Sequence, residues 1–236
     1  MLVAVDTSTR TASLALHDGR QVRHEATWEA DRQHTVQLLP LLNTALENVR
    51  LSPACLSGVA VALGPGSFTG LRVGLAVAKG LALSRSLPLV GIPTLDVVAA
   101  AQGRDRRALV AVLQAGRGRI CAATYRWRQG WRCKSEPVLT TWAELTASVE
   151  QPTLFCGEID EEGAEALERL QDLATVALPA HCLRRAGFLA ELAWERLRRG
   201  QADDPATVAP VYPVSYTHLR AHETPEHLVC RLLLEK

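Results

Sequence analysis

Two polar segments contain residues that could bind an anion or a metal ion. The first, Asp6-Thr7-Ser8-Thr9, directly follows the apolar run Leu2–Val5. Hydroxyls and backbone N–H groups in a tight turn can hold phosphate oxygens, and a carboxylate can hold a metal. Alternatively, Asp6 and the hydroxyls could bond their own backbone, as such residues do in structural turns. Taken alone, this segment favours the structural turn.

The second segment, Gly64–Gly74, reads GPGSFTGLRVG and lies between a predicted strand and a predicted helix. A glycine turn leading into a helix is an arrangement that cradles anions at the helix N-terminus. The Gly-Lys-Ser/Thr ending of a Walker motif is missing. Together the two segments define a candidate nucleotide or phosphate loop made of Asp6, Thr7, Ser8, Thr9, Gly64, Gly66 and Ser67.

Small residues recur along the helix that follows. Gly70, Gly74 and Ala78 are spaced by four, next to a row formed by Val73 and Val77. Each glycine costs a helix about 1 kcal/mol relative to alanine. A smooth stripe allows close approach of another helix, either from within the chain or from a partner. The spacing by itself slightly favours a neighbour within the chain.

The histidines of the tail and the cysteines do not indicate a metal site or a redox site. The tail carries spaced ligand types, His218, His222, Glu223 and His227, but it has no counterpart in the rest of the architecture, so we expect no metal site. No two cysteines form a C-x-x-C pair, which indicates reduced thiols in or near the core. They are Cys55, Cys121, Cys133, Cys156, Cys182 and Cys230. We therefore expect no cofactor and no catalytic residue.

Charge and hydropathy narrow the class of protein. The chain has 236 residues, 47% of them hydrophobic, and a net charge of +1, which disfavours a strongly basic nucleic-acid binder. A solvated surface is the favoured interpretation of the arginines in the second half, and a tRNA-facing patch is the alternative. They are Arg104, Arg106, Arg107, Arg117, Arg119, Arg126 and Arg128. No apolar run reaches the ~20 residues of a membrane helix, and the N-terminus lacks the features of a signal peptide. A cytoplasmic protein without membrane contact is expected.

The elements that must position these residues occur in two similar series. In the first, three strands precede alternating helices and strands: 2–5, 12–16 and 21–25, then helix 34–49, strand 58–63, helix 69–84, strand 89–92 and helix 94–101. In the second, the strands are 108–114, 119–127 and 131–139, followed by helix 142–149, strand 153–156, helix 161–170, strand 174–178 and helix 185–199. The repeated order predicts two α/β lobes of one kind.

Several stretches resemble the TsaB (YeaZ) family: Leu2–Thr9, His34–Leu42, Gly64–Gly74, Ala78–Ala82 and Leu87–Thr94, and more weakly Gly187–Pro210. The resemblance implies the two-lobed α/β fold of the actin/Hsp70-like ATPases (ASKHA), with mixed sheets flanked by helices. Its lobes would be residues 1–103 and 104–213. Residues 214–236 instead resemble translated adapter read-through, and we expect them to be a poorly packed, non-native tail without function.

The same resemblance implies a non-catalytic protein. In the catalytic relative TsaD, a His-x-x-x-His motif binds metal, and Thr94 and Val98 stand at the matching positions here. Family members often have Asp-Ala-Arg after the first strand of the second lobe, whereas this chain has Gln114-Ala115-Gly116-Arg117. Both departures favour a scaffold over an ATPase.

The resemblance further implies a dimerisation subunit of the machinery that makes threonylcarbamoyladenosine in tRNA. Its partners would be TsaD, the ATPase TsaE and, when alone, a second copy of itself, with tRNA reached only through the complex. The interface would lie on the helices of residues 34–49 and 69–84, and Gly74→Leu would abolish pairing in a folded monomer. We expect the interface to comprise Leu38, Leu42, Leu46, Gly70, Arg72, Val73, Gly74, Val77 and Ala78. Two alternatives are an ATP-binding, sugar-kinase-like protein and a glycoprotease-like hydrolase.

Overall fold

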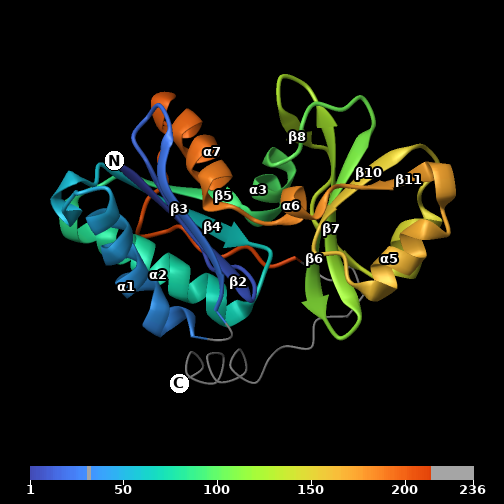
Figure 1. Ribbon diagram of the computed structural model, residues 1–236, viewed down its shortest axis with the longest axis horizontal. Helices are drawn as coiled ribbons and strands as arrows, with labels where there is room; N and C mark the ends of the chain where they lie inside the picture. The colour runs from blue at the N-terminus through green and yellow to red at the C-terminus, as the bar shows by residue number, and fades with distance from the viewer. Residues whose placement is uncertain (31–32, 214–236) are drawn as a thin grey trace, which may run out of the picture.

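A computed structural model describes residues 1–30 and 33–213 of the chain. The predicted tail, with its histidines, lies outside the described residues. Within these residues no helix is long and apolar enough to cross a membrane. Figure 1 shows two lobes side by side, each built on its own sheet.

The first sheet has the strand order β3-β2-β1-β4-β5. Its strands are β1 (Leu2–Asp6), β2 (Thr11–His17), β3 (Val22–Glu29), β4 (Gly58–Gly64) and β5 (Leu89–Pro93). β2 pairs antiparallel with β1 and β3, whereas β1, β4 and β5 are parallel. The Asp18-Gly19 turn after β2 has a positive φ at Gly19, as such hairpin turns require.

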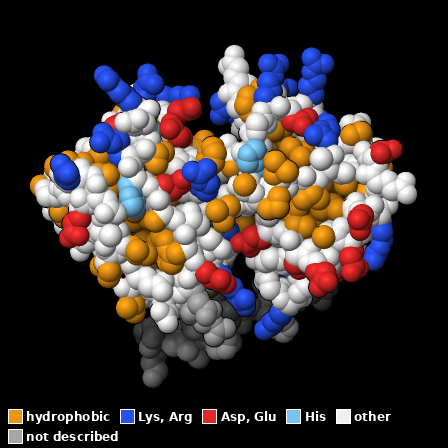
Figure 2. All heavy atoms as spheres, viewed as in Figure 1, with side chains coloured by type: hydrophobic (Ala, Val, Ile, Leu, Met, Phe, Trp, Pro, Cys, Tyr) orange, Lys and Arg blue, Asp and Glu red, His pale blue; other side chains and the backbone are white. Residues whose placement is uncertain are grey.

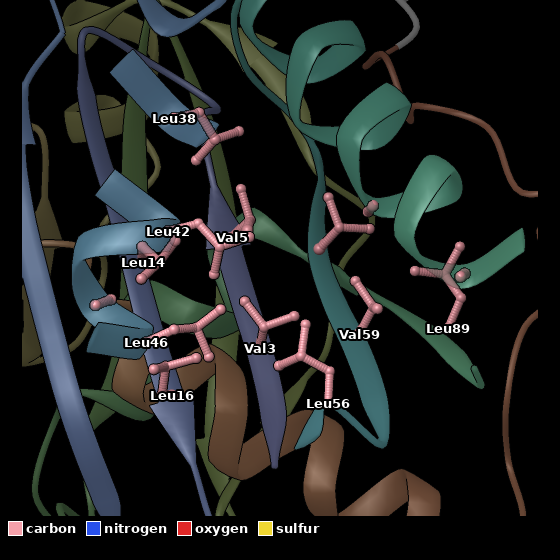
Figure 3. Close-up of a cluster of buried hydrophobic side chains, with 14 of the residues drawn as sticks. Val3, Val5, Leu14, Leu16, Leu38, Leu42, Leu46, Leu56, Val59 and Leu89 are labelled. Carbon is pink, nitrogen blue, oxygen red and sulfur yellow. The ribbon is translucent and has the colours of Figure 1, made fainter. Parts of the chain in front are cut away.

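Helices cover both faces of this sheet. α1 (His34–Asn48) and α2 (Phe68–Arg85) lie on one face, and the 3₁₀ helix η1 (Pro53–Cys55) lies between α1 and β4 in the chain. Because side chains alternate along a strand, Val3 and Val5 point to this face and Leu2 and Ala4 to the other. Figure 3 shows leucines of α1 packed on Val3 and Val5.

The second sheet repeats this topology. Its order is β11-β10-β6-β7-β8, with β9 also paired to β7. The strands are β6 (Ala108–Gly116), β7 (Arg119–Trp127), β8 (Trp131–Cys133), β9 (Val138–Thr140), β10 (Thr153–Gly157) and β11 (Ala174–Val176). The predicted single strand 131–139 is wrong: it is two strands, because Ser135 to Pro137 interrupt the pairing with β7 and proline has no backbone N–H to donate.

The second lobe has fewer long helices. α4 (Trp142–Ala147) and α5 (Glu161–Glu168) cover one face of its sheet, and η2 (Gln171–Leu173) and α6 (Pro179–Cys182) connect the remaining elements. Asp160 joins α4 and α5, because its carboxylate accepts bonds from the Trp142 indole at 2.8 Å and from the Gly163 backbone at 3.0 Å.

The chain crosses between the lobes twice, next to two helices. α3 (Thr94–Ala100) packs Val97 on the first lobe, and Leu95 and Val98 on the second sheet. α7 (Ala186–Arg198) returns to the first sheet and packs on Leu2 and Ala4. Assigning all of residues 104–213 to the second lobe is therefore wrong for α7, since its apolar face is buried against the first sheet.

Candidate functional sites: the interlobe cleft and the exposed helix face

A cleft of about 740 Å³ separates the two lobes. The first lobe contributes the turn after β1 and the N-terminal turns of α1 and α2. The second lobe contributes Gln114 to Gly116 at the end of β6 and Glu158 after β10. Of the candidate phosphate loop, Thr9, Gly66 and Ser67 line this cleft.

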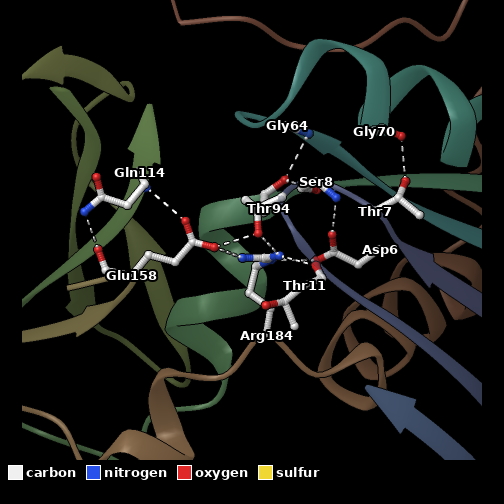
Figure 4. A network of polar contacts seen from close by, with 11 residues as sticks. Asp6, Thr7, Ser8, Thr11, Gly64, Gly70, Thr94, Gln114, Glu158 and Arg184 are labelled. Atoms are coloured by element: carbon white, nitrogen blue, oxygen red, sulfur yellow. Dashed lines mark hydrogen bonds and ion pairs between the residues drawn. The ribbon is translucent and has the colours of Figure 1, made fainter. Parts of the chain in front are cut away.

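A buried arginine ties the two lobes together at one side of the cleft (Figure 4). Arg184 is 3% exposed and donates to Asp6 Oδ2 at 3.2 Å in the first lobe and to Glu158 Oε1 at 2.6 Å in the second. It also donates to the Thr9 hydroxyl at 2.6 Å and to the Thr11 carbonyl at 2.7 Å. The guanidinium is thus bonded to side chains from both lobes.

The carboxylates of this network are themselves fully bonded. Asp6 Oδ1 accepts from the Ser8 backbone at 2.8 Å, and Glu158 Oε2 accepts from the Gln114 backbone at 3.0 Å. Burial alone would lower the pKa of Arg184, but the carboxylates of Asp6 and Glu158 outweigh it and raise that pKa. The guanidinium therefore stays charged and neutralises Asp6, which sequence reasoning had placed in the candidate phosphate loop.

The hydroxyls after β1 also bond within the protein. Thr7 donates to the Gly70 carbonyl at 2.7 Å, and Ser8 Oγ lies 3.0 Å from Thr94 Oγ1. The Gly64 backbone donates to the same Thr94 oxygen at 3.1 Å. Asp6, Thr7, Ser8 and Gly64 are all buried, which corrects the expectation that they would face a bound phosphate. Their polar groups hold two loops of the first lobe and α3 together.

The glycines in the loop before α2 and in its first turns permit this close packing. A Cβ on Gly66 would lie 2.3 Å from the Ser8 carbonyl oxygen, and one on Gly70 would lie 2.1 Å from the Thr7 carbonyl oxygen. A Cβ on Gly74 would lie 2.3 Å from Thr7 Oγ1. The stripe therefore faces the first sheet of its own lobe.

This orientation corrects most of the predicted interface. Gly70, Gly74 and Ala78 are buried in the first lobe, and so are the three leucines predicted on α1, Leu38, Leu42 and Leu46. They fill the core because they form the apolar side of each helix that faces the sheet. Gly74→Leu would therefore disrupt the monomer, contrary to the expectation that it would only block pairing.

The opposite side of the same helices exposes a different apolar set. Val36 is 72% exposed and Leu39 48% on α1, and Phe68 is 55% and Leu83 64% on α2. A shallow hollow of about 440 Å³ lies between α1 and α2, lined in part by Leu39, Phe68 and the predicted residues Arg72, Val73 and Val77. We call Val36, Leu39, Phe68, Arg72, Val73, Val77 and Leu83 the exposed helix face.

One aromatic group anchors this face. The Arg72 guanidinium lies 3.7 Å from the centre of the Phe68 ring, a cation–π contact, and Tyr212 packs on Phe68 at 5.6 Å. Sequence reasoning missed Val36, Leu39, Phe68 and Leu83. The available signal was the spacing of Val36 and Leu39 by three, which places them on one side of α1.

The imidazole of His34 lies at the edge of the cleft. His34, at the start of α1, is 6% exposed and lines the cleft. Burial lowers the pKa of His34, which favours the neutral imidazole. Among residues 1–30 and 33–213, Nδ1 of this ring has no hydrogen-bond partner.

No group of three metal-ligating side chains occurs in the part of the chain that the structure describes. Thr94 and Val98, at the positions of the TsaD histidines, are buried. Of the cysteines in the described ranges, Cys121 and Cys156 are buried, Cys182 is partly buried, and Cys55 and Cys133 are exposed thiols.

The comparisons with known proteins give TsaD for the family model and TsaB or YeaZ for the similar proteins. The family model for TsaD, tRNA N6-adenosine threonylcarbamoyltransferase, matches residues 28–141. The chain is similar to the tRNA threonylcarbamoyladenosine biosynthesis protein TsaB of Bacillus subtilis, with 32% identity over 66% of this chain and 70% of that protein. The structure of YeaZ from Pseudomonas aeruginosa matches 89% of this chain and 99% of its own, with a TM-score of 0.73 and 25% identity.

A more distant structure matches in fold alone. Component A of (R)-2-hydroxyglutaryl-CoA dehydratase from Acidaminococcus fermentans covers 84% of this chain and 98% of its own, at a TM-score of 0.52 and 9% identity. The predicted two-lobed actin/Hsp70-like fold, with mixed sheets flanked by helices, is confirmed.

Proposed function

Because the chain belongs to the TsaB family of tRNA threonylcarbamoyladenosine biosynthesis proteins, we propose that it is a non-catalytic subunit that pairs with TsaD and activates it. TsaD would carry out the transfer, and tRNA would be reached through the complex. We extend the proposal to recruitment of the ATPase TsaE, to self-pairing in the absence of TsaD, and to a cytoplasmic location.

The observation that carries this proposal is the exposed helix face. Monomeric proteins rarely leave contiguous large apolar side chains in water unless the patch has a partner. Aromatic residues and arginine are enriched at the centres of protein interfaces, and Phe68 and Arg72 lie together on this face. A helix pair with such a surface fits a matching helix pair on a related subunit.

The cleft supports the non-catalytic part of the proposal. An ATPase of this fold needs an acid free to face the nucleotide phosphates or their metal. Here the Asp6 carboxylate is 0% exposed and is held by Arg184 and the Ser8 backbone. The sugar-kinase-like alternative predicts stoichiometric ATP binding by the isolated chain, whereas the scaffold proposal predicts none.

The pairing is tested by mixing the chain with TsaD from the same source and measuring the mass by light scattering after size exclusion. We expect a stable heteromer with the wild type, and separate species with Phe68→Glu on the exposed helix face. Leu178→Glu is the matched control, because Leu178 is 69% exposed but lies in the second lobe. Equal pairing by both variants would contradict the proposed interface.

A further inference from the structure

The second lobe carries a basic surface that the pairing does not use, and we propose that it binds the phosphate backbone of RNA. The surface surrounds the turn between β7 and β8, and we call it the hairpin-tip surface. It consists of six exposed cations, Arg104, Arg106, Arg126, Arg128, Arg132 and Lys134. That the RNA is tRNA rests on the proposed function.

Hydrogen bonds hold the two parts of this surface together. The Trp131 indole donates to the Gln102 carbonyl at 3.1 Å, which fixes β8 beside the loop that carries Arg104 and Arg106. The Lys134 backbone donates to the Thr124 carbonyl at 2.7 Å and extends the contact between the two strands. The cations therefore lie on one connected structure.

Charge is concentrated here although the whole chain is nearly neutral. Residues 126–134 read RWRQGWRCK, four cations without an acid, while the net charge of the chain is only +1. Within residues 1–30 and 33–213, none of the six cations forms an ion pair. Of the neighbouring acids, Asp105 pairs with Arg107 at 2.6 Å and Asp96 accepts from Tyr125 at 2.7 Å, whereas Glu136 is exposed near Lys134.

The register of the hairpin places two of these charges face to face. Arg126 and Arg132 are directly opposite each other in the antiparallel pair of β7 and β8. Like charges in such a position destabilise a hairpin. A local arrangement that lowers stability without a compensating contact is typical of a functional surface. An anion between the two guanidinium groups would relieve the repulsion.

The residue types fit the phosphate groups of RNA. Five of the six cations are arginines, whose planar guanidinium groups can bind phosphate oxygens with two parallel hydrogen bonds. Trp127 and Trp131 lie edge to face, with ring centres 5.4 Å apart, on the other face of the hairpin, because side chains alternate along a strand.

The position of the surface leaves it open in the proposed pair. Figure 1 places β8 at the upper end of the second lobe, away from α1 and α2 at the lower side of the first lobe. Figure 2, in the same view, shows Lys and Arg side chains standing along the top of the second lobe, and others above α7 on the first. A partner on the exposed helix face would not cover them.

The test is a titration of fluorescently labelled, in vitro transcribed tRNA with the full chain, alone and assembled with TsaD, between 50 and 200 mM salt. Arg126→Gln/Arg132→Gln removes two cations from the hairpin tip. Arg117→Gln/Arg119→Gln is the matched control, because it removes two exposed arginines at the opposite end of β7. We expect the first pair to weaken binding about tenfold and to reduce the slope of log affinity against log salt by roughly 1 to 2.

The control pair should change the affinity by less than about twofold. Equal weakening by both pairs, or no weakening by Arg126→Gln/Arg132→Gln, would overturn the proposal. Competition by polyglutamate or by phosphatidylserine vesicles as effective as that by unlabelled tRNA would also overturn it. Pairing with TsaD is measured separately in the absence of RNA, so a failure of the proposed function is distinguished from a failure of the RNA site.

Discussion

The interlobe cleft and the exposed helix face differ in which kinds of side chain they bury. In the cleft, polar groups are buried and bonded to one another, with Arg184 joined to Asp6 and Glu158. On the exposed helix face, Val36 and Phe68 are left in water although nearby leucines of α1 are buried. Under the proposed function the helix pair is the surface for pairing, whereas the polar residues beside the cleft hold the two lobes together.

The largest expected loss in the free energy of unfolding comes from breaking the ion pairs beside the cleft. Arg184→Met would leave two carboxylates without their cation, one of them fully buried, and breaking a buried ion pair in this way destabilises a protein by about 3–5 kcal/mol. Urea unfolding followed by circular dichroism would measure the loss. Arg169→Met is the control, because its pair with Glu165 is exposed and contributes at most ~1 kcal/mol. Equal losses in the two variants would show that the cleft network is not structural.

A second prediction separates the buried stripe of α2 from its outer side. Gly74→Ala places a methyl group 2.3 Å from Thr7 Oγ1, so we expect a loss of about 1–3 kcal/mol in the free energy of unfolding. Gly80 has no atom within 4 Å of its added Cβ, and Gly80→Ala should stabilise the helix by ~0.5–1 kcal/mol. Thermal unfolding of both variants checks the signs. A stabilising Gly74→Ala would mean that the stripe faces outward.

A third prediction concerns pH and the unpartnered histidine. Because burial lowers the pKa of His34 in the folded protein, the unfolded chain takes up a proton near its ordinary pKa of 6.5 before the folded protein does. The free energy of unfolding should therefore fall as the pH drops below about 6.5, until the pH reaches the folded-state pKa. Urea unfolding between pH 5 and 8 would measure this, and His34→Gln should reduce the slope. An unchanged slope in His34→Gln would assign the pH dependence to other groups.

The smallest expected effect on stability is on the exposed helix face. Phe68 is 55% exposed, so Phe68→Glu should change the free energy of unfolding by less than about 1 kcal/mol. Thermal unfolding compared with Leu178→Glu checks this. A loss of several kcal/mol would show that Phe68 and its contacts with Tyr212 and Arg72 belong to the core.

Much of the fold could be predicted from the sequence because its elements are regular. A short apolar run predicted β1, alternation predicted β2, and a spacing of three and four predicted α1 with its buried Leu38 and Leu42. The spacing of apolar residues in α2 does not reveal which side of this helix faces the sheet. Gly70 and Gly74 are compatible with close packing against either another helix or a loop. In the structure, the loop after β1 packs against these two glycines.

The cleft network could not be predicted, because it joins residues 178 positions apart, Asp6 and Arg184. A weak signal was present. Arg184 and Arg185 directly precede the N-terminus of α7, where cations are unfavourable to the helix dipole. Each is paired with an acid, Arg184 as described and Arg185 with Glu25. Adjacent arginines at a helix start therefore indicated distant carboxylates without identifying them.

The measurement that tests the account most directly is a calorimetric titration of TsaD into two variants of the chain. We predict that Phe68→Glu binds TsaD at least about thirtyfold more weakly than the wild type, as expected for the loss of an aromatic anchor worth ~2 kcal/mol. Glu158→Gln, in the cleft, should be less stable but bind TsaD within about threefold of the wild type. Normal binding by Phe68→Glu together with lost binding by Glu158→Gln would contradict the account, because the cleft would then be the interaction surface.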